Sequence, residues 1–231
     1  MAIGSTPIAI GELTACAFAA YGTLFDMAAT VGRTRDRLGG QARELARLWR
    51  LHQQQLVRDE GGPSSLRDFW HITGRALDTA LAEIGIKDAL LRARLMQLVL
   101  DADSFPDARA AMEGLRSFGL KIAVFSNATL TMLFSALKHS ALDVPTDNIV
   151  PAVPSAFKPA ESAYAFLCAA LRLEPARVLY VSADPSDAEG AARAGLKAVW
   201  LRRDAASNAA PKSAIATIAT LTELSPLLSR E

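Results

Sequence analysis

Strand-like and helix-like segments alternate along the second half of this 231-residue chain. Residues 108–118 have an amphipathic helical pattern that ends at Gly119, and residues 121–125 form a short apolar run typical of a strand. The alternation continues with a helix at 160–171, a strand at 178–181, a helix at 188–194, a strand at 198–201 and an edge strand at 215–218. Strands separated by helices favour a parallel sheet with helices on both faces, so we expect an α/β, Rossmannoid fold.

The first strand of this sheet is expected close to the N-terminus. Residues 14–19 are small and apolar and run directly into Tyr21-Gly22-Thr23, which indicates a buried strand that ends in a tight turn. Ligands of open parallel sheets bind at the carboxyl ends of the strands, so this turn is a candidate site.

A long helical insertion follows this strand. Between Met27 and Asp101 apolar residues recur only at helical spacing, with a break at Gly61-Gly62-Pro63 and a helix cap at Ser64 or Ser65. Four helices without a strand suggest a separate bundle. We therefore predict an α/β core made of residues 1–26 and 106–231, and an inserted four-helix domain made of residues 27–105.

The composition excludes several classes of protein. Hydrophobic residues make up 51% of the chain, which is ample for a packed core. The formal net charge of +1 provides no field to steer a nucleic acid or an anionic membrane. We see no signal peptide and no apolar run of the roughly 20 residues that span a bilayer. We therefore expect a cytoplasmic protein without a nucleic acid or membrane partner.

The cysteines and histidines do not suggest a metal or redox site. Cys16 and Cys168 fall in apolar runs, where buried thiols are common. His52, His71 and His139 are scattered, with neither metal-ligand spacing nor a serine–histidine–carboxylate arrangement. We expect no metal and no cofactor.

Polar side chains follow several of the predicted strands and are expected to converge at one edge of the sheet. They come after the first strand, after the strand at 121–125, in a later loop, and after the strand at 178–181. With the alanines that stand among them, the residues at these positions are, in chain order, Ala19, Ala20, Tyr21, Thr23, Ser126, Asn127, Ala128, Lys158, Ser182, Ala183, Asp184 and Asp187.

The order of these segments resembles the four motifs of the haloacid dehalogenase superfamily, and within it the type II L-2-haloacid dehalogenases. The resemblance covers nearly the whole chain. The quoted motifs are Tyr21-Gly22-Thr23-Leu24-Phe25-Asp26, Phe125-Ser126-Asn127, Lys158-Pro159 and the segment from Ser182 to Asp187, and Leu48-Trp49-Arg50 resembles the cap segment that supplies an arginine. It implies a haloacid dehalogenase-like core with a helical cap.

The resemblance also implies catalytic roles. In the family an aspartate at the position of Ala19 attacks the halogen-bearing carbon, and water hydrolyses the resulting ester. Lys158 would favour the ionised form of that carboxylate, and Arg50 would reach the departing halide from the cap. The remaining implied catalytic residues are Ser126, Asn127, Ser182 and Asp187, and the implied substrate-binding residues are Tyr21, Thr23, Phe69 and Tyr164.

Simpler structural roles remain open for some of these residues. Arg50 can pair with Glu44 on a helix surface. Ser126 and Asn127 can satisfy a turn, Asp187 can cap a helix, and Asp184 can belong to a turn.

The sequence departs from the family pattern at several positions. The phosphatase branch carries carboxylates where this chain has Tyr21 and Ala183, and their loss removes ligands that Mg²⁺ needs, in agreement with a metal-independent branch. Ala19 has no lone pair and closes the covalent route, and it is either a natural loss or an engineered exchange. Asp184 stands where relatives carry asparagine, and Ser186 where they carry tryptophan.

Three functional hypotheses follow from these features. The first is a 2-haloacid dehalogenase-like hydrolase acting on short 2-halocarboxylates, inactive in this copy because Ala19 replaces the nucleophile. The second is a non-catalytic relative that binds a small carboxylate or a protein. The third is a phosphatase with an unusual nucleophile such as Asp184. A homodimer is common among similar proteins, although no stretch of this sequence indicates one.

Overall fold

The computed structural model describes residues 8–60, 68–152, 156–203 and 210–229. The break at Gly61-Gly62-Pro63 and the cap at Ser64 or Ser65 lie outside the described residues. Within them, no helix is both long enough and apolar enough to cross a bilayer.

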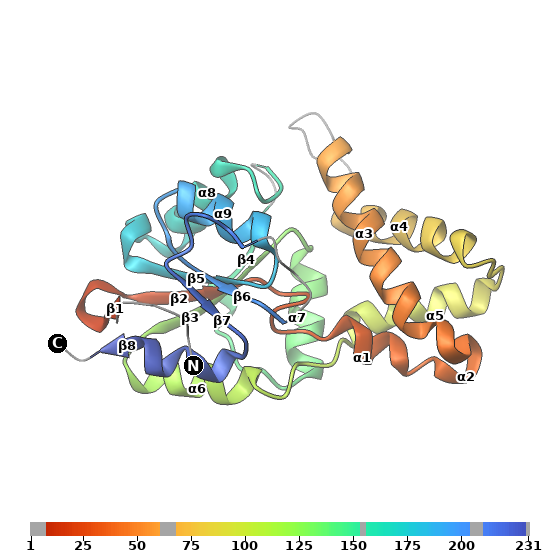
Figure 1. Ribbon diagram of the computed structural model, residues 1–231, viewed down its shortest axis with the longest axis horizontal. Coiled ribbons are helices and arrows are strands. Elements are labelled where there is room, and N and C mark those ends of the chain that lie inside the picture. The colour runs from red at the N-terminus through yellow and green to blue at the C-terminus, as the bar shows by residue number, and fades with distance from the viewer. Residues whose placement is uncertain (1–7, 61–67, 153–155, 204–209, 230–231) are drawn as a thin grey trace.

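Within these described ranges, six parallel strands form the central sheet, which confirms the predicted fold class (Figure 1). Their order is β4-β3-β2-β5-β6-β7. The bounds are Ala15–Phe18 for β2, Lys121–Ser126 for β3, Ile149–Pro151 for β4, Val178–Ser182 for β5, Lys197–Leu201 for β6 and Ala216–Ile218 for β7. The strand expected at 215–218 is an edge strand, as predicted.

The register of the central strands decides which side chains can meet. Ala17 of β2 lies between Ala123 of β3 and Tyr180 of β5. Because these strands are parallel, the residues that follow them reach the same edge of the sheet. Ala19 therefore lies between the segments that begin at Ser126 and Ser182.

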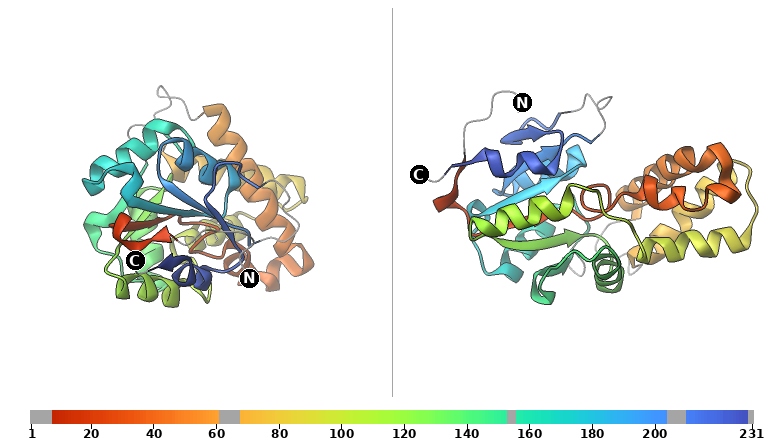
Figure 2. Two further views of the ribbon diagram at one scale, coloured as in Figure 1. Left: turned by 60° about the vertical axis from the view of Figure 1, so that its left-hand side comes forward. Right: turned by 90° about the horizontal axis from the view of Figure 1, so that it is seen from below.

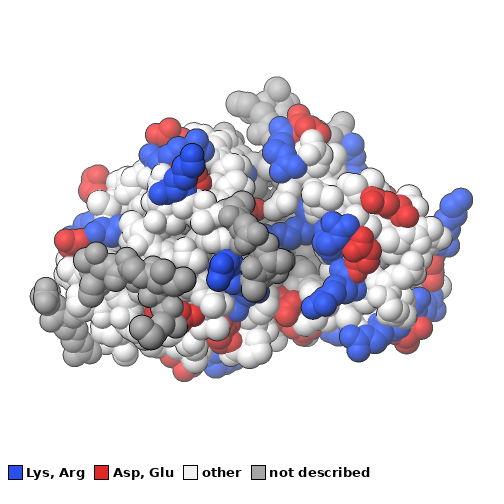
Figure 3. All heavy atoms as spheres, in the orientation of Figure 1, with Lys and Arg blue, Asp and Glu red and all other residues white. Residues whose placement is uncertain are grey.

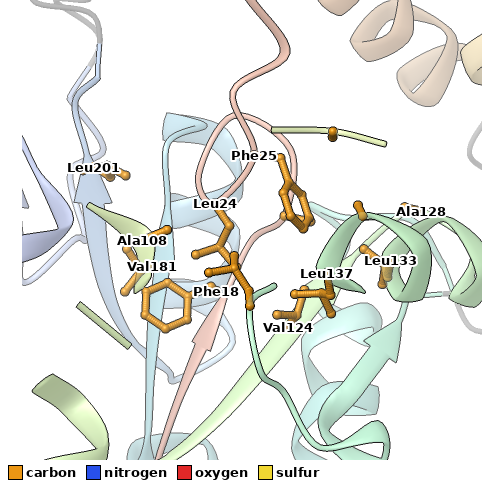
Figure 4. Close-up of a cluster of buried hydrophobic side chains, with 14 of the residues drawn as sticks. Phe18, Leu24, Phe25, Ala108, Val124, Ala128, Leu133, Leu137, Val181 and Leu201 are labelled. Carbon is orange, nitrogen blue, oxygen red and sulfur yellow. The ribbon is translucent and has the colours of Figure 1, made fainter. Parts of the chain in front are cut away.

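Helices cover both faces of the sheet. They are α6 (Ala108–Ser117) and α7 (Leu130–His139) on one face, and α8 (Glu161–Leu171) and α9 (Pro185–Arg193) on the other. Phe18, Val124 and Val181 pack against the first pair of helices in one core (Figure 4). The opposite face, with Phe125 and Tyr180, packs against the second pair. Strands buried on both sides explain their nearly continuous apolar sequence.

Smaller elements complete this part of the molecule. Strands β1 (Ile8–Ala9) and β8 (Leu228–Ser229) form a separate parallel pair. The 3-10 turns here are η1 (Ile10–Glu12), η3 (Thr146–Asn148), η4 (Pro175–Arg177), η5 (Leu221–Glu223) and η6 (Ser225–Leu227), and a further one, η2 (Gly39–Gln41), lies in the helical segment after β2.

The segment after β2 is helical, as expected, and extends from one side of the α/β body (Figures 1 and 2). Its helices are α1 (Met27–Gly32), α2 (Arg35–Leu38), α3 (Ala42–Glu60), α4 (Phe69–Glu83) and α5 (Ala89–Leu100). Four helices were predicted; the described part of this segment has three long ones and two short ones, α1 and α2, at the start. The Trp49 indole nitrogen donates to the Thr73 carbonyl oxygen at 2.9 Å and ties α3 to α4.

Two neighbouring stretches of chain join the helical segment to the sheet. The Asp26 amide donates to the Asp103 carbonyl at 2.7 Å, and the Phe105 amide donates to the Leu24 carbonyl at 2.8 Å. Phe25 and Ser104 form an antiparallel bridge between these bonds. The proposed division into a core of 1–26 and 106–231 and a cap of 27–105 would have its junctions at this crossing.

Candidate active site

A cavity of about 750 Å³ lies between α3 and the carboxyl edge of the sheet. Its walls include Ala19, Tyr21, Arg50, Phe69, Ser126, Asn127, Lys158, Ser182 and Asp187. Lys and Arg side chains gather around the hollow between the two parts of the molecule in Figure 3. Most of the residues singled out in the sequence therefore meet around one cleft.

The turn after β2 places the Ala19 methyl group at the wall of this cleft. The Ala19 amide donates to the Val181 carbonyl at 2.9 Å and so continues the sheet pairing. Gly22 has a φ of +83°, a conformation that favours glycine, and its amide donates to the Phe25 carbonyl at 2.8 Å. The turn thus exposes position 19 to the cavity without supplying a reactive group there.

Two of the predicted substrate-binding residues have other partners. The Thr23 hydroxyl is buried and accepts the Ala183 amide at 2.9 Å, and the Tyr164 hydroxyl bonds to Asp187. Neither Thr23 nor Tyr164 is among the described residues that line the cavity. Tyr21 does line it, and its hydroxyl donates to the Val99 carbonyl at 3.0 Å.

Lys158 is held in a buried polar cluster. Its Nζ lies 2.8 Å from Oδ2 of Asp187, 2.7 Å from the Tyr180 hydroxyl and 3.3 Å from the Phe125 carbonyl oxygen. An ammonium group has three N–H donors, so these contacts use all of them. The Asn127 side chain fixes the Lys158 backbone, accepting its amide at 2.7 Å and donating to its carbonyl at 3.2 Å.

Asp187 accepts hydrogen bonds at both carboxylate oxygens. Oδ2 also receives the hydroxyls of Ser182 at 2.7 Å and Tyr180 at 2.9 Å, while Oδ1 receives the Tyr164 hydroxyl at 2.6 Å. Burial and the neighbouring Asp187 charge raise the pKa values of Tyr164 and Tyr180, which keeps both hydroxyls protonated as donors. Sequence reasoning missed Tyr180, because a tyrosine inside an apolar strand gives no signal of a polar role.

Ser126, the last residue of β3, satisfies a turn and also lies at the cavity. The Ser126 hydroxyl accepts the Ala128 amide at 3.2 Å, which satisfies the turn, and Ser126 also lines the cavity. A residue that stabilises its own loop can still present the remaining lone pair and proton to a ligand.

Arg50 reaches from α3 across the cleft to the turn after β2. A Cβ atom built at Gly22 would overlap Nη1 of Arg50 and lie 3.2 Å from its Cζ, so the guanidinium packs directly on the glycine. The alternative partner Glu44 instead pairs with Arg47 at 2.7 Å. Phe69 lines the same cavity and packs on Phe157, with 6.0 Å between ring centroids.

Asp184 caps α9, a role that the sequence analysis had considered for Asp187. Its Oδ1 accepts the Ser186 amide at 2.9 Å and hydroxyl at 2.6 Å, and its Oδ2 accepts the Gln54 side-chain amide at 2.5 Å. Burial raises the pKa of the Asp184 carboxyl, but the Ser186 hydrogen bond and the Arg50 charge outweigh it, so the pKa is lowered. Asp187 is thereby left for Lys158.

Arg203 is a cavity residue that sequence reasoning missed. Its guanidinium makes two hydrogen bonds to Asp107, at 2.8 and 2.9 Å, and one to the Thr23 carbonyl at 2.8 Å. It also lies 3.7 Å from the centroid of the Phe105 ring. Arg203 therefore ties the end of β6 to the turn that carries position 19.

The described residues contain no group of three or more His, Cys, Asp and Glu side chains arranged to hold a metal ion. The expectation of a metal-independent and cofactor-independent protein stays a prediction.

This chain is similar to known proteins both in sequence and in fold. A family model described as haloacid dehalogenase-like hydrolase matches residues 13–195. The chain is 35% identical over 196 residues to (S)-2-haloacid dehalogenase 4A of Burkholderia cepacia, covering 84% of this chain and 85% of that one. A dehalogenase structure with an intermediate complex is 32% identical with a TM-score of 0.84, covering 95% and 99%. The L-2-haloacid dehalogenase of Xanthobacter autotrophicus with covalently bound chloropropionic acid is 26% identical with a TM-score of 0.80, covering 93% and 98%.

Proposed function

The chain belongs to the haloacid dehalogenase-like hydrolases, and from this premise we propose that its cleft binds short 2-halocarboxylates without cleaving them. The observation that carries the proposal is the Ala19 methyl group, which lines the same cavity as Lys158, Arg50 and Ser126. An aspartate at this position would face a buried ammonium group and a guanidinium. With alanine there, the cleft keeps its binding groups and lacks a nucleophile.

The proposed chemistry of the ancestral site follows from these positions. A carboxylate at position 19 would attack the carbon that carries the halogen, form an ester and release halide, and water would then hydrolyse the ester. Arg50 would stabilise the departing halide, since a guanidinium is permanently charged and weakly hydrated. Ser126 and nearby backbone amides would hold the substrate carboxylate, and Phe69 and Tyr21 would enclose its carbon chain.

The other polar residues are proposed to position this machinery. Asn127 holds the Lys158 backbone, and Ser182 and Asp187 orient its side chain. Tyr164 supports Asp187 from behind. These contacts support roles that act through Lys158 rather than on the substrate.

Restoring the nucleophile tests the proposal. We expect no chloride release from (S)-2-chloropropionate by the chain as given, and measurable release by Ala19→Asp. Ala19→Asn is the matched control, because an amide of the same shape cannot form the ester intermediate. If the aspartate variant keeps its fold and releases no chloride, the proposal that only the nucleophile is missing is contradicted.

One observation favours a second candidate, a natural binding protein. The three N–H donors of Lys158 are all satisfied without any group at position 19, so the cluster is complete with alanine there. This candidate predicts saturable binding of a small carboxylate, or of a protein partner at the cleft, and no turnover even by Ala19→Asp. The predicted cytoplasmic location and homodimer are untouched by this choice and stay predictions.

The phosphatase reading has less support. Both oxygens of Asp184 already accept hydrogen bonds, from Ser186 and from Gln54, and its carboxyl pKa is lowered. A carboxylate stabilised in this way is a weaker nucleophile, and stimulation of phosphate release by magnesium is not expected.

A further inference from the structure

Among the described residues, two cation–carboxylate pairs have both partners in the cavity wall, and they differ in the distance between the charges. Lys158 and Asp187 are 2.8 Å apart and both nearly buried, whereas Nη2 of Arg50 lies 4.0 Å from Oδ2 of Asp184. The Arg50 side chain is 45% exposed, and no hydrogen bond joins its guanidinium to any residue within the described ranges. Its donors therefore remain available to a ligand, while its charge is partly offset by Asp184.

Asp184 does not depend on Arg50 for its position. Oδ1 is fixed by the amide and hydroxyl of Ser186 and by the Asp187 amide, and Oδ2 is fixed by Gln54. When an anion approaches Arg50, the Asp184 carboxylate cannot swing away without losing these bonds. Its negative charge stays beside the incoming ligand.

We propose that Asp184 lowers the affinity of the cleft for small anions, because its fixed negative charge offsets the charge of Arg50. The inference rests on the proposed function, since it takes a short carboxylate or a halide as the ligand. Positions 19 and 184 affect an anionic ligand in opposite ways. Alanine at position 19 carries no charge that would repel the ligand, whereas the carboxylate at position 184 does repel it.

The substitution Asp184→Asn isolates this charge. Asparagine is as good a helix N-cap as aspartate, and the Gln54 side-chain amide can turn to offer its oxygen to the new NH₂ group. We expect Asp184→Asn to bind (S)-2-chloropropionate about two- to fivefold more tightly at low ionic strength, which corresponds to the range for a partly exposed charge pair. Asp184→Ser, which keeps a capping oxygen, is expected to give the same direction.

The binding measurement is isothermal titration of the intact chain with (S)-2-chloropropionate and, separately, with chloride. In an Arg50→Gln background, Asp184→Asn is expected to change affinity less than twofold, because the offset of charge requires the guanidinium. Asp68→Asn is the matched control: Asp68 also caps a helix, α4, and does not line the cavity.

The outcomes separate this inference from the proposed function. Binding by the unmodified chain with no gain in Asp184→Asn and Asp184→Ser overturns the inference alone. An equal gain in the Arg50→Gln background also overturns it, because the effect would then be a general change of charge. Absence of binding by every variant contradicts the proposed function and this inference together.

Discussion

Asp187→Asn should be among the most destabilising conservative substitutions in the sheet body. It removes the carboxylate charge that lies 2.8 Å from the Lys158 ammonium, in a site where both side chains are 9% exposed. Neutralising one partner leaves an uncompensated buried charge, so we expect the free energy of unfolding to fall by about 3 kcal/mol. For a chain of this size that corresponds to a drop in Tm of roughly 10 °C.

The test is guanidinium chloride unfolding followed by tryptophan fluorescence, with Lys158→Met and the double variant measured alongside. Removing both charges leaves no unpaired ion. We therefore expect the loss of unfolding free energy in the double variant to be smaller than the sum of the two single losses by at least about 1 kcal/mol, as is typical of residues in contact. A loss below about 1 kcal/mol in Asp187→Asn, as expected for a surface pair, would refute the reasoning. Strict additivity of the two substitutions would refute it as well.

Three further expectations follow from individual contacts. Gly22→Ala places a methyl group against the Arg50 guanidinium at a residue with a positive φ. We expect the free energy of unfolding, measured in denaturant, to fall by about 1 kcal/mol, and anion binding, measured by titration, to weaken several-fold. Burial raises the pKa of Asp107, but the Arg203 hydrogen bonds lower it below its usual value of 3.8, so this pair stabilises the fold above that pH and the stabilisation is lost as pH falls through the folded-state pKa. Asp107→Asn should therefore cost about 2 kcal/mol at pH 7, with the difference shrinking in unfolding curves below about pH 4. Burial, and then Glu174, raise the pKa of the Cys168 thiol to about 11, so it should stay unmodified by iodoacetamide at pH 8 until denaturant is added, as mass spectrometry would report.

Most of the sheet could be predicted from sequence because its strands are buried on both faces. The runs at 121–125, 178–181 and 198–201 carry that pattern, and each corresponds to a strand. The strand β4 was missed, since three residues at a sheet edge leave too short a pattern to detect.

Residues of the cavity wall were predictable at most positions that a motif quotes, with Thr23 as an exception, and unpredictable where only the fold brings a residue in. Lys158 and Asp187 were expected near each other and are bonded. Arg203 comes into the site from the end of a distant strand, and Gln54 from a polar helix turn, so neither has a local signal. Of the two roles considered for Asp187, the structure shows the contact with Lys158, and the cap of α9 is Asp184, which was expected in a turn.

Phe25 and Ser104 pair where the chain enters and leaves the helical segment, so the two connections of this segment to the α/β body lie side by side. A different set of helices inserted between these two points would leave the strands and the buried polar cluster of Lys158 and Asp187 unchanged. It would change the residues that cover the cleft. Such an exchange would replace Arg50 and Phe69 and keep Ser126 and Asp184, since the cavity wall takes residues from both parts of the chain.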